Sequence, residues 1–419
     1  VRMSRRKIRP FLFAALALCG SLPSTILPAP SRPAPGSIVA RVVAGIQGRM
    51  PSWFEQGKAP GMAVAVVDDK AVLWHGVYGH TSRVMDKPVT PRTLFSIQSM
   101  SKSFTALGVL MAVQDGLLDL DAPVTDYLPD FRVLSRFEER PERKMTLRHL
   151  LSHRAGFSHE APVGGNYDSR PATFGEHVLS ISETWLRYPV GYRYSYSNMG
   201  IDLAGAILEK RTGAPFAAYI REKVLIPIGM SDSTLDPETI LKAEDRALGH
   251  VAPTLKVAAG IPVEIPMVPA GGVYAGLLDM ARYLMFHINQ GRLDGRTLLR
   301  EDLMRAMHTV AFPEPHERFG YGLGIATGHY GPEAFYSHGG GGYGFGSYMA
   351  MFPGLKLGII YMANSELGGR GVGWLTDMVG DLVMETAGPP GPELERPTFD
   401  TGRPVPPDDA RIRRLAGDY

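Results

Sequence analysis

The chain is poor in cysteine and lacks a long apolar run. Its 419 residues include one cysteine, Cys19, so no disulfide forms within the chain and no zinc site can be built from cysteines. An apolar segment at residues 11–22 is shorter than the about 20 residues that a membrane-spanning helix needs. With 44% hydrophobic and 21% charged residues, the composition excludes a collagen-like, coiled-coil or wholly disordered chain.

An excess of positive charge is absent from the body of the chain. The formal net charge is +2, but five of the 44 basic residues lie among the first ten positions. The other 39 stand against 42 acidic residues. Because nucleic-acid binding calls for a basic face, we do not expect nucleic acid as a partner.

Several widespread catalytic signatures are also missing. No G-x-S-x-G occurs, which excludes the nucleophile elbow of α/β-hydrolases. His149 and His153 stand four residues apart, but Leu150 occupies the place of the glutamate in HExxH, so we expect a structural role for both histidines. Residues 339–344 satisfy G-x-G-x-x-G, but the segment that follows favours a strand, whereas a dinucleotide site requires a helix.

The first 36 residues are typical of an export signal followed by a linker. Three basic residues at 5–7 precede the apolar segment, which predicts a signal peptide over residues 1–22. Residues 23–36, rich in Pro, Ser and Ala, predict a linker. The residues before Cys19 are similar to a bacterial lipobox, although Leu18 stands where a small residue is usual. Cleavage, lipidation of Cys19 and a retained anchor stay open, and each implies an exported protein, periplasmic or secreted.

The apolar pattern predicts an α+β fold. Its spacing indicates helices at residues 37–56, 99–114, 198–211 and 374–386. Short apolar runs indicate a hairpin, 62–67 and 71–74, and strands at 321–327, 347–351 and 357–362. Strands near both ends with helices between them predict an antiparallel sheet, flanked by N- and C-terminal helices, with a mostly helical lobe inserted.

Ser99 and Lys102 place a hydroxyl and an amine three residues apart at the start of a predicted helix. Positions i and i+3 share a helix face, so the amine can reach the hydroxyl. A desolvated lysine can accept a proton from serine and activate it as a nucleophile. The spacing alone is weak evidence, because Ser4 and Lys7 repeat it inside the export signal.

Two further segments carry groups that suit acyl transfer. Tyr196 beside a cation is a candidate proton shuttle, and Asn198 offers an amide to Lys102 and to substrate. The alternation of tyrosines from position 192 to 196 is equally typical of packing. His338 opens a glycine-rich stretch that includes Gly340 and Gly341, whose backbone allows close approach of a ligand and N–H groups for an oxyanion.

In order along the chain, these pieces resemble the serine β-lactamase and penicillin-binding-protein superfamily. The similarity is greatest to its branch of class C-like esterases and D-aminopeptidases, and it covers most of residues 37–386. Residues 95–105 resemble the nucleophile motif, residues 194–198 the second motif, and residues 338–340 the third in its H-x-G form. Residues 150–156 and 227–230 resemble landmarks between the motifs.

The resemblance implies a β-lactamase/transpeptidase-like catalytic domain over residues 37–387. Residues 388–419 would be a Pro-rich tail or the start of a truncated C-terminal domain. Ser99 would be the nucleophile, with Lys102 and Tyr196 sharing the general-base task. The N–H groups of Ser99 and Gly341 would form the oxyanion hole. Substrate would contact Asn198, His338 and Gly340. The resemblance implies no cofactor and no metal.

The third motif bears on the substrate, a small molecule or short peptide with an ester or amide bond. Many β-lactamases and carboxypeptidases have lysine there, a fixed cation suited to a carboxylate. His338 is expected to be mostly neutral at pH 7. We therefore expect esterase or aminopeptidase-like activity ahead of β-lactamase activity. The alternatives are a penicillin-binding sensor that deacylates slowly and a catalytically inactive scaffold.

Overall fold

The computed structural model describes residues 33–387, apart from residues 57–58, 167, 169, 252–253, 255, 258–265, 313–318 and 367–372. The predicted signal peptide, most of the predicted linker and the predicted C-terminal tail lie outside these residues and stay predictions. Within the described part, no helix combines the length and the apolar character that crossing a membrane requires.

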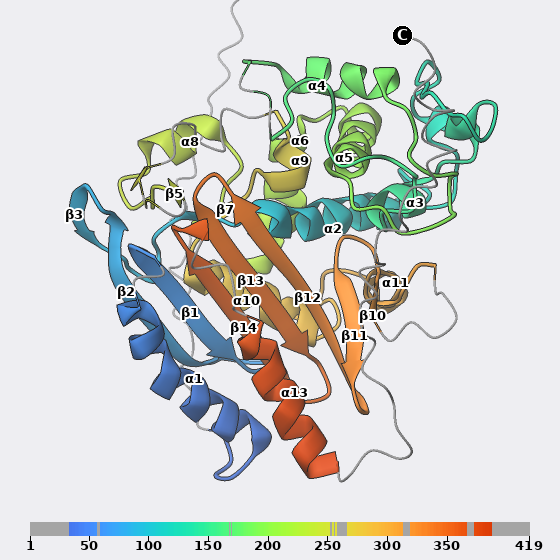
Figure 1. Cartoon of the computed structure of the whole chain (residues 1–419). Helices are drawn as coiled ribbons and strands as arrows, with labels where there is room; N and C mark the ends of the chain where they lie inside the picture. Colours follow the sequence, from blue (N-terminus) through green and yellow to red (C-terminus); the bar gives the residue numbers. More distant parts are fainter. Residues whose placement is uncertain are drawn as a thin grey trace, which may run out of the picture.

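Eight antiparallel strands form the central sheet, in the order β10-β11-β12-β13-β14-β1-β2-β3 (Figure 1). The first strand of the chain, β1 (Gly61–Val67), pairs with its neighbour in sequence, β2, and with the last strand, β14. The other strands are β2 (Val72–Ser82), β3 (Met85–Pro88), β10 (Phe319–Tyr321), β11 (Ala326–Tyr330), β12 (Glu333–Gly342), β13 (Phe345–Phe352) and β14 (Leu357–Ala363).

The hairpin between β1 and β2 forms because Asp68 supplies its own turn. Oδ1 of Asp68 accepts hydrogen bonds from the backbone N–H groups of Lys70 (2.8 Å) and Ala71 (2.7 Å). An aspartate that bonds the backbone two residues on is a typical turn former. The predicted hairpin is confirmed.

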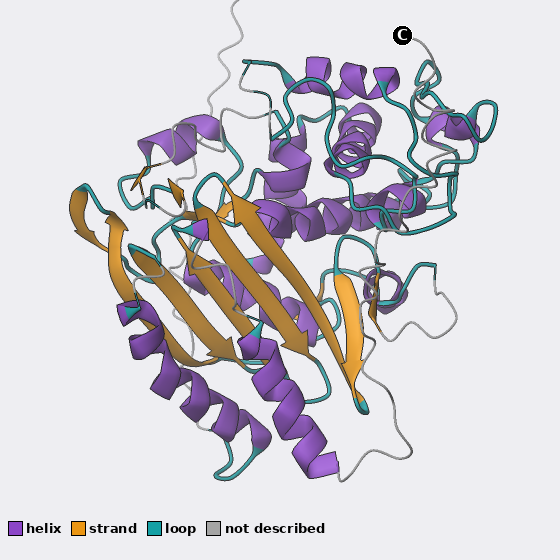
Figure 2. Ribbon diagram, viewed as in Figure 1, coloured by secondary structure: helices purple, strands orange, loops and turns teal. Residues whose placement is uncertain are grey.

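Helices cover both faces of the sheet (Figure 2). The terminal helices α1 (Ile38–Glu55) and α13 (Trp374–Ala387) contact each other on one face and share a hydrophobic cluster with Met62, Val64 and Val66 of β1. The alternate residues of β1 belong to the main core on the other face, where α10 (Leu277–Ile288) packs. Because successive side chains of a strand point to opposite faces, β1 is buried on both sides.

The inserted segments form a mostly helical lobe above one end of the sheet (Figure 1). Helix α2 (Ser101–Gln114) runs between the lobe and the sheet, and twelve of its residues are buried. The remaining helices are α3 (Leu147–Leu151), α4 (Phe174–Ser180), α5 (Asn198–Thr212), α6 (Phe216–Ile220), α7 (Ile226–Ile228), α8 (Pro237–Lys242), α9 (Val268–Gly271) and α11 (Glu301–His308). Short strand pairs join β4 (Phe95–Ser96) to β7 (Tyr274–Ala275), β5 (His250–Val251) to β6 (Lys256–Val257), and β8 (Arg292–Leu293) to β9 (Arg296–Thr297).

The predicted α+β architecture, with an antiparallel sheet, flanking terminal helices and a helical lobe, is confirmed. One predicted strand differs in detail. The strand expected at 321–327 is broken after Tyr321, and β11 begins at Ala326. Gly324 in the gap has φ +70°, a left-handed conformation that cannot continue a strand. The apolar pattern of this segment reflects burial of the connection itself.

Candidate active site

Ser99 lies at the tight junction between β4 and α2. A 3₁₀ turn, Gln98–Met100, connects the two elements, and Gln98 adopts φ +50°. A non-glycine residue in this left-handed region is costly and persists where surrounding contacts hold it. The side-chain amide of Gln98 donates to Oγ of Ser96 at 2.7 Å, which fixes the turn. The strained residue therefore sits directly before the predicted nucleophile.

Lys102 reaches Ser99 from the first turn of α2. Its Nζ donates a hydrogen bond to Oγ of Ser99 (2.9 Å) and another to the carbonyl oxygen of Ala270 (2.9 Å). The Lys102 side chain is fully buried. Buried charges in proteins are normally paired or hydrogen-bonded, and here the two acceptors hold the amine against the hydroxyl. The amine of Lys102 thus reaches the hydroxyl of Ser99, as their spacing predicts.

Tyr196 and Asn198 stand where the chain enters α5. Ser197 caps this helix, because its side chain accepts from the N–H of Gly200. The ring of Tyr196 lies 5.0 Å, centroid to Nζ, from Lys102, within the range of a cation–π contact. Asn198 is buried and its Oδ1 has no hydrogen-bond partner among the described atoms.

His153 supports the segment that carries Tyr196. Its backbone carbonyl accepts from the N–H of Ser195, and its Nδ1 accepts from the N–H of Ser197 (3.1 Å). The His153 ring packs on that of Tyr196, with centroids 4.4 Å apart. Burial, followed by the nearby charge of Lys102, holds the pKa of His153 well below its usual value. His153 is therefore a neutral support for Tyr196.

The glycine-rich segment forms the end of β12 that faces the nucleophile turn. A Cβ at Gly340 would lie 2.1 Å from the carbonyl oxygen of Ile97, so only glycine allows this approach. Gly341 has open space where a Cβ would be and borders a pocket with Ser99 and Asn198. That pocket is also lined by Gln98, Asn166, Met267, Ala270, Gly271 and Tyr343.

Both ring nitrogens of His338 are engaged within the protein. Nδ1 lies 2.6 Å from the carbonyl oxygen of Gly339, which fixes the proton on Nδ1, so Nε2 accepts from the hydroxyl of Tyr321 at 2.7 Å. Burial, followed by the charge of Lys102, lowers the pKa of His338 to about 3. The ring is neutral, as expected, but because of burial and not because the pKa stays near 6.5. Contact of His338 with substrate stays a prediction.

Of the seven site residues predicted from sequence, Ser99, Asn198 and Gly341 line the pocket. Lys102 and Tyr196 lie behind Ser99, and Gly340 packs on the turn before it. These residues come from three segments that are far apart in the chain. The structure brings them together, and their individual roles stay predictions.

A comparison with models of protein families identifies the family of this chain. The model named Beta-lactamase matches residues 39–376. The chain belongs to the Beta-lactamase family. It is 29% identical over 320 residues to the unguisins hydrolase ungD' of Aspergillus campestris, covering 73% of this chain and 58% of that protein. It is 30% identical over 204 residues to esterase EstB of Burkholderia gladioli, covering 45% of this chain and 51% of the esterase. The chain thus spans little more than half the length of these two relatives.

Another curated relative and two solved structures match over most of this chain. Penicillin-binding protein 4 of Amycolatopsis lactamdurans is 27% identical over 387 residues, which is 89% of this chain and 96% of that protein. The octameric penicillin-binding protein homologue from Pyrococcus abyssi superposes with TM-score 0.69 at 25% identity, covering 82% of this chain and 77% of that one. D-amino acid amidase from Ochrobactrum anthropi shares the fold, with TM-score 0.67 at 22% identity, over 83% of this chain and all of that one. The resemblance drawn from the three motifs is confirmed.

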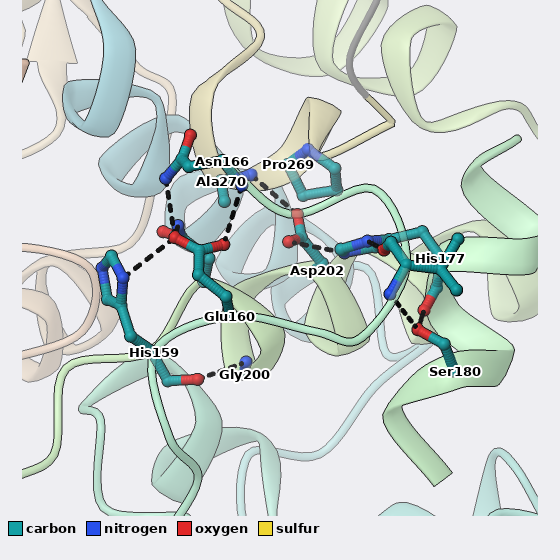
Figure 3. Close-up of polar contacts among 12 residues, drawn as sticks. His159, Glu160, Asn166, His177, Ser180, Gly200, Asp202, Pro269 and Ala270 are labelled. Carbon is teal, nitrogen blue, oxygen red and sulfur yellow. Dashed lines mark hydrogen bonds and ion pairs between the residues drawn. The ribbon is translucent and has the colours of Figure 1, made fainter. Parts of the chain in front are cut away.

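A carboxylate beside the family motifs was not selected by sequence spacing. Glu160 lies close to Asn198, whose Nδ2 donates to its Oε1 at 2.9 Å. Figure 3 shows Glu160 with Asn166 and His159. The Nδ2 of Asn166 donates to the same oxygen at 2.6 Å, and Nδ1 of His159 lies 2.9 Å from it. Burial raises the pKa of Glu160, but the contacts with His159 and Asn166 outweigh this effect and lower it. Glu160 is therefore an anion that orients two pocket-lining amides.

The two histidines at 149 and 153 do not form a metal pair. Helix α3 ends at Leu151 and His153 has φ +59°, so the histidines do not share a helix face. His149 instead pairs with Oγ1 of Thr146 at 2.9 Å. Within the described residues, no group of three or more His, Cys, Asp or Glu side chains is arranged to hold a metal ion. The structural role expected for both histidines fits these contacts.

Proposed function

We propose that this chain is a serine hydrolase that cleaves an ester or amide bond through an acyl-enzyme on Ser99. The observation that carries the proposal is the 2.9 Å contact between Nζ of the buried Lys102 and Oγ of Ser99 at the pocket floor. A nucleophile and a base within hydrogen-bond reach, with the base held by a third group, is the arrangement that covalent catalysis needs. Here the third group is the carbonyl of Ala270.

The geometry supports a two-step reaction. Oγ of Ser99 attacks the carbonyl carbon while its proton passes to Lys102, with Tyr196 beside it to relay the proton to the leaving group. The N–H groups of Ser99 and Gly341 would stabilise the oxyanion, and each such donor contributes about 10²–10³ in rate. Water then attacks the acyl-enzyme and the same groups return the proton to Ser99.

The charges around the pocket favour substrates without a carboxylate beside the scissile bond. His338 is neutral and Glu160 is an anion that contacts Asn198. Among the described residues that line the pocket, there is no arginine or lysine. We therefore place ester or aminopeptidase-like substrates ahead of β-lactams and of peptides with a free terminal carboxylate. Esterase EstB and D-amino acid amidase, named above, are relatives with such activities in their names.

Intact-protein mass after incubation with an aryl phosphonate tests the nucleophile. The wild-type protein is expected to gain one covalent phosphonyl group, and Ser99→Ala is expected to gain none. Asn166→Ala, which alters the pocket wall and retains Ser99, should still be labelled. Absence of an adduct in folded wild-type protein would contradict the serine-hydrolase proposal.

Incubation with an activated aryl ester then separates a hydrolase from a sensor. An acyl adduct that forms and decays within a turnover time supports hydrolysis. An adduct that persists at one equivalent per chain, with no further product release, identifies the slowly deacylating sensor instead.

A further inference from the structure

The carbonyl group that accepts from Lys102 belongs to a short helix, in which the N–H of Gly271 donates to the carbonyl of Met267. Helix α9 (Val268–Gly271) is a single turn, and the carbonyl oxygen of Ala270 accepts from Nζ of Lys102. Side chains from other elements anchor this turn. Oγ1 of Thr105 donates to the carbonyl of Pro269 at 2.6 Å, and the N–H of Ala270 donates to Oδ1 of Asp202 at 3.0 Å. Thr105 and Asp202 thus fix the Pro269–Ala270 peptide group, which directly precedes the Ala270–Gly271 group whose carbonyl accepts from Lys102.

Asp202 is in turn held by His177. Asp202 stands one turn after Asn198 on α5, so both residues face the site from the same side of the helix. Its Oδ2 lies 3.1 Å from Nε2 of His177 on α4 (Figure 3). Nδ1 of His177 lies 2.7 Å from the carbonyl oxygen of Val163. Both side chains are fully buried.

The partners of His177 dictate its protonation. A carbonyl oxygen only accepts, so Nδ1 carries a proton, and the carboxylate of Asp202 favours a second proton on Nε2. Burial disfavours the charged imidazole, but the hydrogen bond to Asp202 and the charge of that carboxylate outweigh burial and raise the pKa of His177. Burial also raises the pKa of Asp202, and its contacts with His177 and with the N–H of Ala270 offset this effect in part. Because these contacts favour the carboxylate and the imidazolium, we take the pair as ionised and neutral as a whole.

We propose that Asp202 and His177 are positioning residues: they hold the Pro269–Ala270 peptide group and thereby place the adjacent Ala270 carbonyl, which fixes Lys102 against Ser99. The chain of contacts runs from His177 to Asp202, then to the backbone N–H of Ala270, and from the carbonyl of Ala270 to Nζ of Lys102. This inference rests on the proposed hydrolase function, since it assigns a role toward that function's base.

The pair also sets the charge that Lys102 senses. Asp202 and Lys102 interact electrostatically. The other titratable groups that face Lys102 are His153 and His338, both held neutral by burial, and the ring of Tyr196. Glu160 acts on the pair from the pocket side, because its charge also favours the imidazolium of His177. Loss of the imidazolium would leave the Asp202 carboxylate uncompensated near Lys102.

Two isosteric variants separate this role from a merely structural one. In Asp202→Asn, Oδ1 can still accept from Ala270 and Nδ2 can donate to a neutral His177, but the negative charge is gone. In His177→Gln, the amide can still donate to Asp202, but the positive charge is gone. The readouts are kcat, KM and the pH profile of kcat/KM with a neutral 4-nitrophenyl ester, together with Tm.

We expect both variants to lower kcat by about tenfold, an effect of about 1.4 kcal/mol on the barrier, with KM within about twofold of wild type. The acid limb of kcat/KM should move to lower pH in Asp202→Asn, because a negative charge near the site is removed. It should move to higher pH in His177→Gln, because the carboxylate is no longer compensated. A shift of about half a pH unit in each direction is expected.

The matched control is Glu176→Gln, which changes an exposed capping residue of α4 next to His177. It should leave kcat and the acid limb as in wild type. Asp202→Asn and His177→Gln proteins that lower only Tm, or whose acid limbs move in the same direction, would overturn the positioning role.

Nitrogen NMR of ¹⁵N-histidine-labelled wild-type protein tests the charged pair directly, and it does not depend on the folding of any variant. Both ring nitrogens of His177 are expected to carry protons at pH 7, and an unprotonated Nε2 would overturn the charged pair. Because NMR reads the pair directly, its result stands apart from turnover. Wild-type protein that shows the imidazolium but never hydrolyses an ester would contradict the proposed function, not the pair.

Discussion

At the scale of single residues, the site is organised around atoms that can only accept hydrogen bonds. The carboxylate of Glu160 takes the Nδ2 groups of Asn198 and Asn166, so both amides must turn their carbonyl oxygens elsewhere. Oδ1 of Asn198 is buried without a partner among the described atoms and borders the pocket. The orientation of both amides therefore follows from the Glu160 carboxylate, which can only accept.

Replacement of Glu160 by glutamine tests the electrostatic side of this arrangement. Glu160→Gln removes the negative charge and keeps one acceptor oxygen. We expect kcat/KM for an anionic ester, such as 4-nitrophenyl hemisuccinate, to rise about fivefold relative to neutral 4-nitrophenyl butyrate. An effect of this size is expected for the removal of a unit charge several ångströms away in a partly solvated pocket. The two esters are measured side by side. Equal changes for both would mean that Glu160 acts only by orienting Asn198.

At the scale of elements, β12 and the nucleophile turn are packed backbone to backbone. A Cβ at Gly340 would lie 2.1 Å from the carbonyl oxygen of Ile97 and 2.5 Å from Oγ of Ser347, which itself donates to that carbonyl. The obstruction at Ile97 is main chain and cannot rotate away. Any side chain at position 340 must therefore push β12 away from the turn that carries Ser99.

We predict that Gly340→Ala impairs activity and stability together. The strand shift should lower kcat/KM at least tenfold, and overpacking of this kind typically costs about 1–3 kcal/mol. Gly339→Ala is the matched control, because the nearest atoms to its Cβ lie at an ordinary 3.8 Å. Thermal unfolding and ester hydrolysis are compared for the two variants. Equal Tm and equal kcat/KM for both would contradict close packing at Gly340.

The elements that carry the motifs were predictable because their signals are local. The i, i+3 spacing of Ser99 and Lys102 and the apolar spacing over residues 198–211 both predict the observed structures. The supports of the site were not predictable in this way. Glu160, His177 and Asp202 act through contacts 25 to 68 residues apart in sequence, and no spacing selects them.

At the scale of the whole molecule, the sheet and the lobe meet at the site. The sheet contributes β12, the lobe contributes α5 and α9, and α2 between them carries Lys102 (Figure 1). The sheet order could be inferred only through the family resemblance, since strands at the two ends of the chain pair in its centre. Periodicity gives which segments are strands, but pairing between β1 and β14 is a long-range contact that local patterns do not encode.

Buried neutral histidines make the folded molecule sensitive to acid. His287 and His308 are buried, with Nδ1 of the first 2.9 Å from Nε2 of the second, so one ring donates and the other accepts. Burial lowers the pKa of His287 to about 3 and that of His308 well below its usual value. In the unfolded chain these histidines bind protons near pH 6.5, whereas in the folded protein they bind protons only at a much lower pH.

The sign of the effect follows from that difference in proton binding. Below about pH 6.5 the unfolded state holds more protons, so stability falls with decreasing pH by up to about 1.4 kcal/mol per pH unit for each such histidine. His177 has a raised pKa, so it stabilises the folded state as the pH falls through about 6.5 and adds no slope once both states are protonated. We expect the free energy of unfolding in urea to decrease steadily from pH 7 to pH 5. His308→Gln should reduce that slope by up to one proton equivalent, with exposed His329→Gln as the control for loss of an imidazole. An unchanged slope in His308→Gln would show that His308 is not held neutral in the folded protein.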